Sequence, residues 1–234
     1  MFLGHFAVSF AAKKPAPSVS LGTLFLAAQL VDLLWPLFLL LGFEHARIDA
    51  GNTAVTPLDF YDYPFTHSLA GAVLWSFTLG LLYYAVKRNM RNAVIVGTAV
   101  SSHWILDFLT HRPDLPLWFS GGPHFGLGLW NSVAGTVTVE VGLFGLGLFL
   151  YTRSTIAEDK IGSIGLWSLA CFLGLIYVAS LAGPPPPDVG AIAVVGNSMW
   201  LLVLFAYWVD RHRTIALSSS GSAQKSITTP KGIV

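Results

Sequence analysis

Charged side chains are scarce in this sequence. Asp, Glu, Lys and Arg together make up 11% of the 234 residues, whereas hydrophobic residues make up 54%. Because soluble globular domains carry about 25% charged residues, this composition predicts an integral membrane protein whose partner is the lipid bilayer. The formal net charge is only +1, and the sequence has no basic patch that would neutralise phosphates. We therefore expect no nucleic-acid partner.

Cysteine is almost absent. The single thiol, Cys171, lies in an apolar run, so no internal disulfide can form and a thiolate metal site is not expected. A cleavable leader is not indicated either. Residues 2–12 are too short to cross a bilayer and lack the positive segment that begins a signal peptide. We therefore expect these residues, with His5 among them, to be retained.

Long apolar segments are plentiful. A helix needs about 20 mostly apolar residues to cross the bilayer, and six such segments occupy residues 21–43, 67–86, 93–111, 130–152, 163–183 and 191–210. Basic clusters occur in alternate connections, at 13–14, 87–91, 153–160 and 211–213, which the positive-inside rule places in the cytoplasm. The sequence predicts an all-α polytopic membrane helix bundle in a bacterial-type inner (plasma) membrane, with both termini cytoplasmic.

Two further segments complete the predicted organisation. Residues 1–12 should form a short half-helix at membrane depth, which is tolerated only if other helices cover it, so His5 should face inward. Residues 214–234 are of low complexity, which predicts a disordered cytoplasmic tail. Residues 1–213 then form a single integral membrane domain.

Ionisable residues inside the apolar segments are the candidate functional residues. His103 and Asp107 lie four positions apart in the third segment, so a helix presents them on one face. Asp32 lies near the middle of the first segment, and His67 opens the second. With a rise of about 1.5 Å per residue, all four residues fall in the outer half of the membrane, within reach of His5. Such groups are tolerated in lipid only when they pair, bind a metal or line a wet cavity.

Each of these residues also has a simpler interpretation. Asp32 could hydrogen-bond Gln29, His67 could cap a helix or lie among lipid headgroups, and His103 with Asp107 could be a pair that stabilises helix packing. Taken together, a set of His and Asp without Cys suits a divalent metal, with zinc expected first and manganese or iron as alternatives.

Four further ionisable residues are less clearly placed. Glu140, in the middle of the fourth segment, must be protonated, paired or functional at that depth. His111 ends the third segment, on the helix face of His103 and Asp107, and is expected at the surface or in a loop, as are His45 and His124 in the external connections.

Four short motifs, in order, resemble a known family. They are Gly4-His5, Leu30-Val31-Asp32, Phe65-Thr66-His67-Ser68 and His103-x-x-x-Asp107-x-x-Thr110. Over about residues 1–120 they are similar to the YdjM-type inner-membrane metal-dependent hydrolases. The resemblance implies hydrolase chemistry similar to that of zinc-dependent phospholipase C enzymes, which also use a His-x-x-x-Asp helix. It implies a metal site formed by His5, Asp32, His67, His103 and Asp107.

The sequence departs from this family pattern in two places. Val31-Asp32-Leu33-Leu34-Trp35 stands where the family often has Pro-Asp-x-Asp-His, which leaves fewer ligands for a second metal. Asp62-Tyr63-Pro64 stands where the family often has His-Arg-Gly, so a residue that could clamp an anion is missing. The second departure counts against phosphate-ester substrates.

Three functions are compatible with these residues. The first is a membrane-embedded metal-dependent hydrolase acting on an amphiphilic, lipid-like or lipid-phosphate substrate, with Asp32 or Glu140 as the catalytic base if neither is a ligand. The second is a small transporter or permease that uses the same His and Asp residues as an ion or proton relay. The third is a scaffold in which the metal is purely structural.

Overall fold

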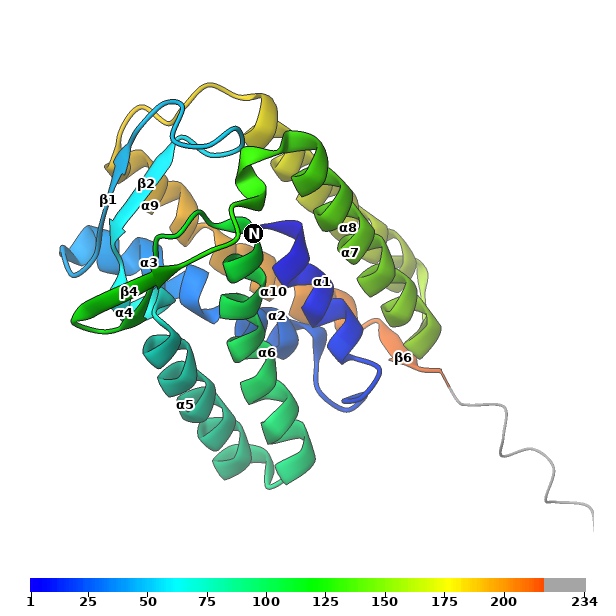
Figure 1. Cartoon of the computed structure of the whole chain (residues 1–234). Helices are drawn as coiled ribbons and strands as arrows, with labels where there is room; N and C mark the ends of the chain where they lie inside the picture. Colours follow the sequence, from blue (N-terminus) through cyan, green and yellow to red (C-terminus); the bar gives the residue numbers. More distant parts are fainter. Residues whose placement is uncertain (217–234) are drawn as a thin grey trace, which may run out of the picture.

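The computed structural model describes residues 1–216, and long apolar helices dominate it (Figure 1). Four single helices are long and apolar enough to cross a membrane: α5 (Leu69–Lys87), α6 (Met90–Thr110), α7 (Val133–Ser154) and α8 (Lys160–Ala182). A fifth span, Val189–Asp210, consists of α9 (Val189–Asn197) and α10 (Met199–Asp210). The protein is therefore an all-α, multi-pass membrane helix bundle, which confirms the predicted fold class.

The first predicted span is bent. Helices α2 (Leu21–Ala28) and α3 (Leu30–Leu41) meet at an angle of 56° and count as a sixth span only when taken together. Gln29 is the residue at the bend, with φ −103° and ψ 4°, outside the helical region. Pro36 lies inside α3 without ending it. The bend positions the end of α2 against α6, which matters for the site.

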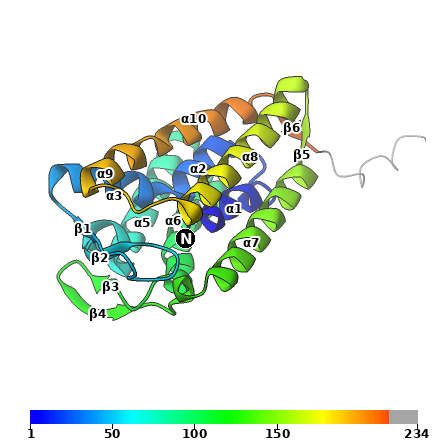
Figure 2. The same cartoon turned by 90° about the horizontal axis from the view of Figure 1, so that it is seen from above.

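Helix α1 (Leu3–Ala12) lies in the interior of the bundle. Figure 2 shows it between α7 on one side and α2 and α6 on the other, and all three contact it. Phe6, Phe10 and His5 are buried. Gly147 allows this packing, because a Cβ there would come within 2.5 Å of the Ala7 carbonyl oxygen. The predicted covered half-helix with an inward-facing His5 is confirmed.

Short antiparallel strand pairs occupy two of the connections between the predicted spans. β1 (His45–Ile48) pairs with β2 (Leu58–Asp62), and β3 (Leu115–Trp118) pairs with β4 (Gly121–Phe125). Both pairs lie on one side of the molecule in Figure 1, together with the short helix α4 (Pro64–His67). A 3-10 helix, η1 (Leu129–Asn131), precedes α7. These elements form a cap over one end of the bundle.

A third strand pair lies at the opposite end. β5 (Thr155–Ala157) pairs with β6 (Arg213–Ile215), so the first residues of the predicted tail are paired backbone (Figure 2). The rest of that predicted tail lies outside the described residues, which end at 216.

A buried ion pair fastens α1 at this end. Lys13 Nζ donates to Asp210 Oδ2 at 2.8 Å, with side chains only 7% and 10% exposed. Asp210 also accepts from Tyr151 Oη at 2.8 Å and from the Leu21 amide at 3.0 Å. One carboxylate thereby joins α10 to α7, to α2 and to the residue that follows α1.

Candidate metal centre

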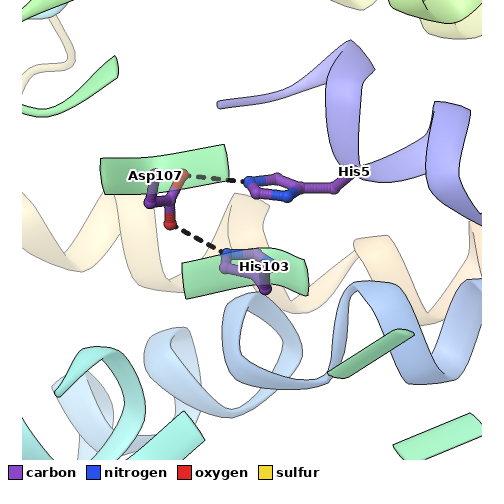
Figure 3. A group of neighbouring side chains, drawn as sticks. All are labelled: His5, His103 and Asp107. Atoms are coloured by element: carbon purple, nitrogen blue, oxygen red, sulfur yellow. Dashed lines mark hydrogen bonds and ion pairs between the residues drawn. The ribbon is translucent and has the colours of Figure 1, made fainter. Parts of the chain in front are cut away.

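Four elements bring His and Asp side chains to one point. Helix α6 provides His103 and Asp107, one turn apart on its buried face, and α1 provides His5 (Figure 3). Asp32 comes from the first turn of α3, and His67 is the last residue of α4. The structure thus brings together all five residues that the family resemblance implied.

Asp107 is the centre of the cluster. Its Oδ1 lies 3.1 Å from His5 Nε2, and its Oδ2 lies 3.1 Å from His103 Nε2 and 3.8 Å from His67 Nε2. The α-amino nitrogen of Met1 lies 2.5 Å from Oδ1. Both oxygens therefore face nitrogen atoms from different elements.

Asp32 completes the cluster on the other side of His103. Its Oδ1 lies 3.3 Å from His67 Nε2 and 3.5 Å from His103 Nε2. Two overlapping groups result, one of His5, His103 and Asp107 and the other of Asp32, His67 and His103. The ligand atoms within each group lie within 4.8 Å of one another. Metal–nitrogen and metal–oxygen bonds are about 2.0–2.2 Å long, so two ligand atoms of one ion lie at most about 4.4 Å apart. The 3.3 and 3.5 Å separations between Asp32 and the two histidines of the second group meet this limit.

Second contacts fix the orientation of both central histidines. His103 Nδ1–H donates to the Ala28 carbonyl at 2.8 Å, at the bend between α2 and α3. His67 Nδ1–H donates to Thr66 Oγ1 at 2.7 Å, because the Thr66 hydroxyl itself donates to Glu44 Oε2 at 2.7 Å. When either ring is neutral, Nε2 therefore carries the lone pair, which is how metal-binding histidines are usually arranged.

This orientation makes the cluster unstable without a cation. His103 Nε2 is buried and makes no hydrogen bond, although oxygens of Asp107 and Asp32 lie 3.1 and 3.5 Å away. A lone pair that faces two carboxylates is repelled by them. The repulsion is removed either by a proton on Nε2, which makes an imidazolium, or by a divalent ion. The donor set, all neutral imidazole and carboxylate, fits zinc, manganese or iron.

The stacking of two rings limits how many ligands one ion can take. The His5 and His103 rings are nearly parallel, with 5° between their planes and 3.5 Å between their centroids. The lone pairs of a ring lie in its plane, so those of two parallel, stacked rings do not meet at one point. His5 and His103 therefore cannot both bind the same ion with good geometry in this arrangement.

His111 lies in the same site, and our expectation of a surface or loop position was wrong. It is 2% exposed, with Nε2 4.0 Å from Asp107 Oδ1 and Nδ1–H donating to Asp114 Oδ1 at 2.9 Å. Burial lowers the pKa of His111 and so favours the neutral ring that a metal requires. Its spacing from His103 and Asp107, two turns and one turn along α6, was the signal in the sequence. His45 and His124, in contrast, are exposed as expected.

Tyr63 supports His111 from the cap. Its hydroxyl donates to Asp114 Oδ1 at 3.0 Å. Burial and the neighbouring Asp114 carboxylate raise the pKa of Tyr63 well above its ordinary value, so the hydroxyl keeps its proton.

Glu140 makes contacts typical of a helix cap. Its Oε2 accepts from the amides of Phe2, at 2.9 Å, and Gly4, at 3.3 Å. These are the free N–H groups at the start of α1, which a carboxylate stabilises. The contacts support a role in holding α1, and His5 on it, in position; the predicted catalytic role remains a prediction.

The cluster opens into a cavity of about 540 Å³. Asp32, His67, Asp107 and His111 form part of its wall, and the side chain of Asp32 is 25% exposed. The loop at residues 50–57 and the end of α8 with the following prolines form other walls. A second hollow of about 380 Å³, between α5 and α6, is lined by no His, Asp or Glu. The first cavity is therefore the candidate substrate site.

No family model matches this chain, and neither a curated protein nor a solved structure matches it. The family resemblance therefore stays a prediction.

Proposed function

We propose that this protein is a membrane-embedded metal-dependent hydrolase of the YdjM type that acts on an amphiphilic, lipid-like substrate. The observation that carries the proposal is His103 Nε2, which is buried, without a hydrogen bond and directed at two carboxylates. A divalent ion, zinc first among the candidates, satisfies all three groups at once. The adjoining cavity falls within the usual 300–1,000 Å³ range of ligand sites, at about 540 Å³.

The ring stacking supports two ion positions bridged by Asp107. The first position would use Asp32, His67, His103 and Oδ2 of Asp107. The second would use Oδ1 of Asp107 together with His5, at the oxygen that the Met1 ammonium contacts in the structure. The stacked His5 and His103 rings would then bind different ions, and the bridging carboxylate would offer one oxygen to each position, an arrangement common in two-metal hydrolases.

Bound divalent ions would polarise the scissile group and lower the pKa of a water molecule, which becomes a nucleophile near neutral pH. The chain itself supplies the geometry. Asp32 is the carboxylate of the cluster that the cavity exposes, so it is the candidate base that accepts the proton of the attacking water. Thr66 and the Ala28 carbonyl hold the two imidazoles in a ligand tautomer.

The proposed location follows from the charge distribution. The basic connections lie at the end of the bundle away from the site, so the positive-inside rule would place that end and the C-terminal strand β6 in the cytoplasm and the cavity on the opposite side. The prediction of a cytoplasmic N-terminus does not fit this arrangement, because the Met1 ammonium contacts Asp107 in the site itself. In a bacterial-type inner membrane the cavity would then face the outer leaflet, where an amphiphile can present its headgroup.

A proton or ion relay is the second candidate function, because an imidazolium at His103 would also remove the repulsion. One feature of the fold disfavours it. Between the cluster and the Lys13–Asp210 end lies an apolar core that includes Phe6, Phe10 and Phe25. A transport path would have to open this core, whereas a hydrolase needs access from the cavity side alone.

The proposal is tested with protein purified in a neutral maltoside detergent and loaded with zinc. Hydrolysis of short-chain phospholipids should require the metal, stop with a chelator, and be abolished by His103→Ala. His124→Ala, an exposed histidine outside the cluster, is the matched control and should retain wild-type activity. A metal-loaded wild type without hydrolysis, but with His103-dependent proton flux in proteoliposomes, would favour the relay instead.

A further inference from the structure

The cavity is poor in positive charge. Among the described Lys and Arg residues, only Arg47 and Arg112 occur in the cap, and neither lines the cavity. Both are paired with Asp59, which is nearly buried: Arg47 Nε lies 2.6 Å from Asp59 Oδ2, and Arg112 contacts Oδ1. The other described Lys and Arg residues are in the turns at the far ends of the helices: Lys13, Lys14, Lys87, Arg88, Arg91, Arg153, Lys160, Arg211 and Arg213. Among the described residues, no Lys or Arg side chain lines the cavity, and the ammonium of Met1, which does line it, is paired with Asp107.

The walls of the cavity are acidic and aromatic instead. Glu140 lines it in addition to the carboxylates of the metal cluster. Aromatic rings line it as well, among them Trp35, Phe60 and Trp130. Phe60 stacks on Trp130 with 6.2 Å between ring centroids and lies 5.4 Å from Trp35. Carboxylates combined with aromatic faces are the surroundings that an alkylammonium group prefers.

An unpartnered hydroxyl points to a ligand as well. Tyr177, on α8, lines the cavity, is 4% exposed, and its buried Oη has no hydrogen-bond partner in the described structure. Phe2 stacks against its ring with 6.5 Å between centroids. A buried hydroxyl without a partner costs free energy, and a polar group of a bound headgroup would satisfy it.

From these features we propose that the cavity selects amphiphiles whose headgroup carries an ammonium group beyond the scissile phosphoester. The inference rests on the proposed function in one respect, because it takes the phosphoester as the group held at the metal positions. Bound divalent ions would neutralise that phosphate in place of the arginine that this sequence lacks. The rest of the headgroup then meets Glu140 and the Trp130–Phe60 wall, which attract a cation and repel a second anion.

Two single-chain amphiphiles provide a matched probe. Dodecylphosphocholine and dodecylphosphoglycerol have the same chain and the same phosphodiester, and they differ in the ammonium group. Binding to the full-length protein in maltoside is measured by titration calorimetry, both with zinc and after chelation. We expect the choline compound to bind about tenfold more tightly in both states, as cation–π contact in a desolvated site implies.

Variants of Trp130 test whether this ring causes the preference for the ammonium headgroup. Trp130→Leu should remove most of the preference, and Trp130→Phe should keep it because the aromatic face remains. Trp118→Leu is the matched control, since Trp118 is 59% exposed on β3 and does not line the cavity. Thermal unfolding of each variant checks that the fold is intact.

The outcomes separate this inference from the proposed function. Equal or reversed affinities in the wild type, or a preference that survives in Trp130→Leu, would overturn the inference even if the protein hydrolyses phospholipids. A choline preference that disappears with Trp130 supports the inference, and absence of hydrolysis in the same preparation would count against the hydrolase proposal alone.

Discussion

Replacing Lys13 by Met should loosen α1 and with it the metal site. Lys13 follows α1 directly and lies eight residues after His5, about 12 Å along a helix. Its partner Asp210 is 10% exposed, so removal of the ammonium leaves a carboxylate in a poorly hydrated place. The helix that carries His5 then loses its fastening to α10.

The size of the expected stability loss depends on the hydrogen bonds that Asp210 keeps in the variant. Removing one partner of a buried ion pair costs about 3–5 kcal/mol. Asp210 still accepts hydrogen bonds from Tyr151 and from the Leu21 amide, so we expect a value near the lower bound, about 3 kcal/mol. For a protein of this size that corresponds to a fall in Tm of roughly 6–12 °C.

Lys14→Met is the matched control, because Lys14 is the exposed neighbour. Thermal unfolding in maltoside should show a large loss for Lys13→Met and almost none for Lys14→Met. In a double-mutant cycle, Asp210→Asn should cost less in the Lys13→Met background than in the wild type. Zinc titration should show weaker binding in Lys13→Met. Equal unfolding temperatures for the two lysine variants would refute the reasoning.

Three further results are expected. Acidification through and below about pH 6.5 should release bound metal and lower the metal-dependent part of stability, because histidine binds metal only when neutral. An unfolding temperature that changes with neither pH nor chelator in this range would argue against a metal site. Thr66→Val should weaken metal binding by about 10–100-fold, because His67 loses its acceptor, whereas Thr66→Ser should not; titration with a zinc indicator measures both. Reporter fusions at residues 55 and 120 should give external signals, and cytoplasmic signals there would contradict the topology.

The sequence predicted the helices well because bilayer-length apolar runs have few alternatives. The exact ends were less predictable, since they depend on caps. The fifth predicted span, 163–183, begins instead at Lys160 because the Asp159 side chain accepts from the Gly162 amide. The fourth, 130–152, begins at Val133 behind the equivalent cap of Ser132.

The bend at Gln29 and the strand pairs of the cap were not predicted. Pro36 is the residue in the first span that usually interrupts helices, yet α3 continues through it and the bend occurs seven residues earlier. The bend is accompanied by a tertiary contact, the bond from His103 to the Ala28 carbonyl. A backbone carbonyl that accepts a tertiary hydrogen bond cannot be recognised from the sequence, because every residue has one.

The His/Asp cluster was predictable to the extent that lipid makes isolated charges costly. His103 and Asp107 follow from helix spacing, and His5, Asp32 and His67 follow from depth together with the motifs. The partners that orient the ligands were not predictable. Glu44 lies 22 positions before Thr66, and the two residues are in contact only because of the fold of the cap.

The metal content of the purified chain decides whether the His/Asp cluster binds divalent ions. Protein expressed in zinc-supplemented medium, purified in maltoside and exchanged into metal-free buffer, is analysed by mass spectrometry of the elements beside His103→Ala. We expect about two divalent ions per wild-type chain, as a carboxylate-bridged pair requires, and at least one fewer in the variant. A folded wild type that binds no zinc, manganese or iron, even after reconstitution, would show that a proton on His103 removes the repulsion from the two carboxylates. That result would contradict the proposed metal centre.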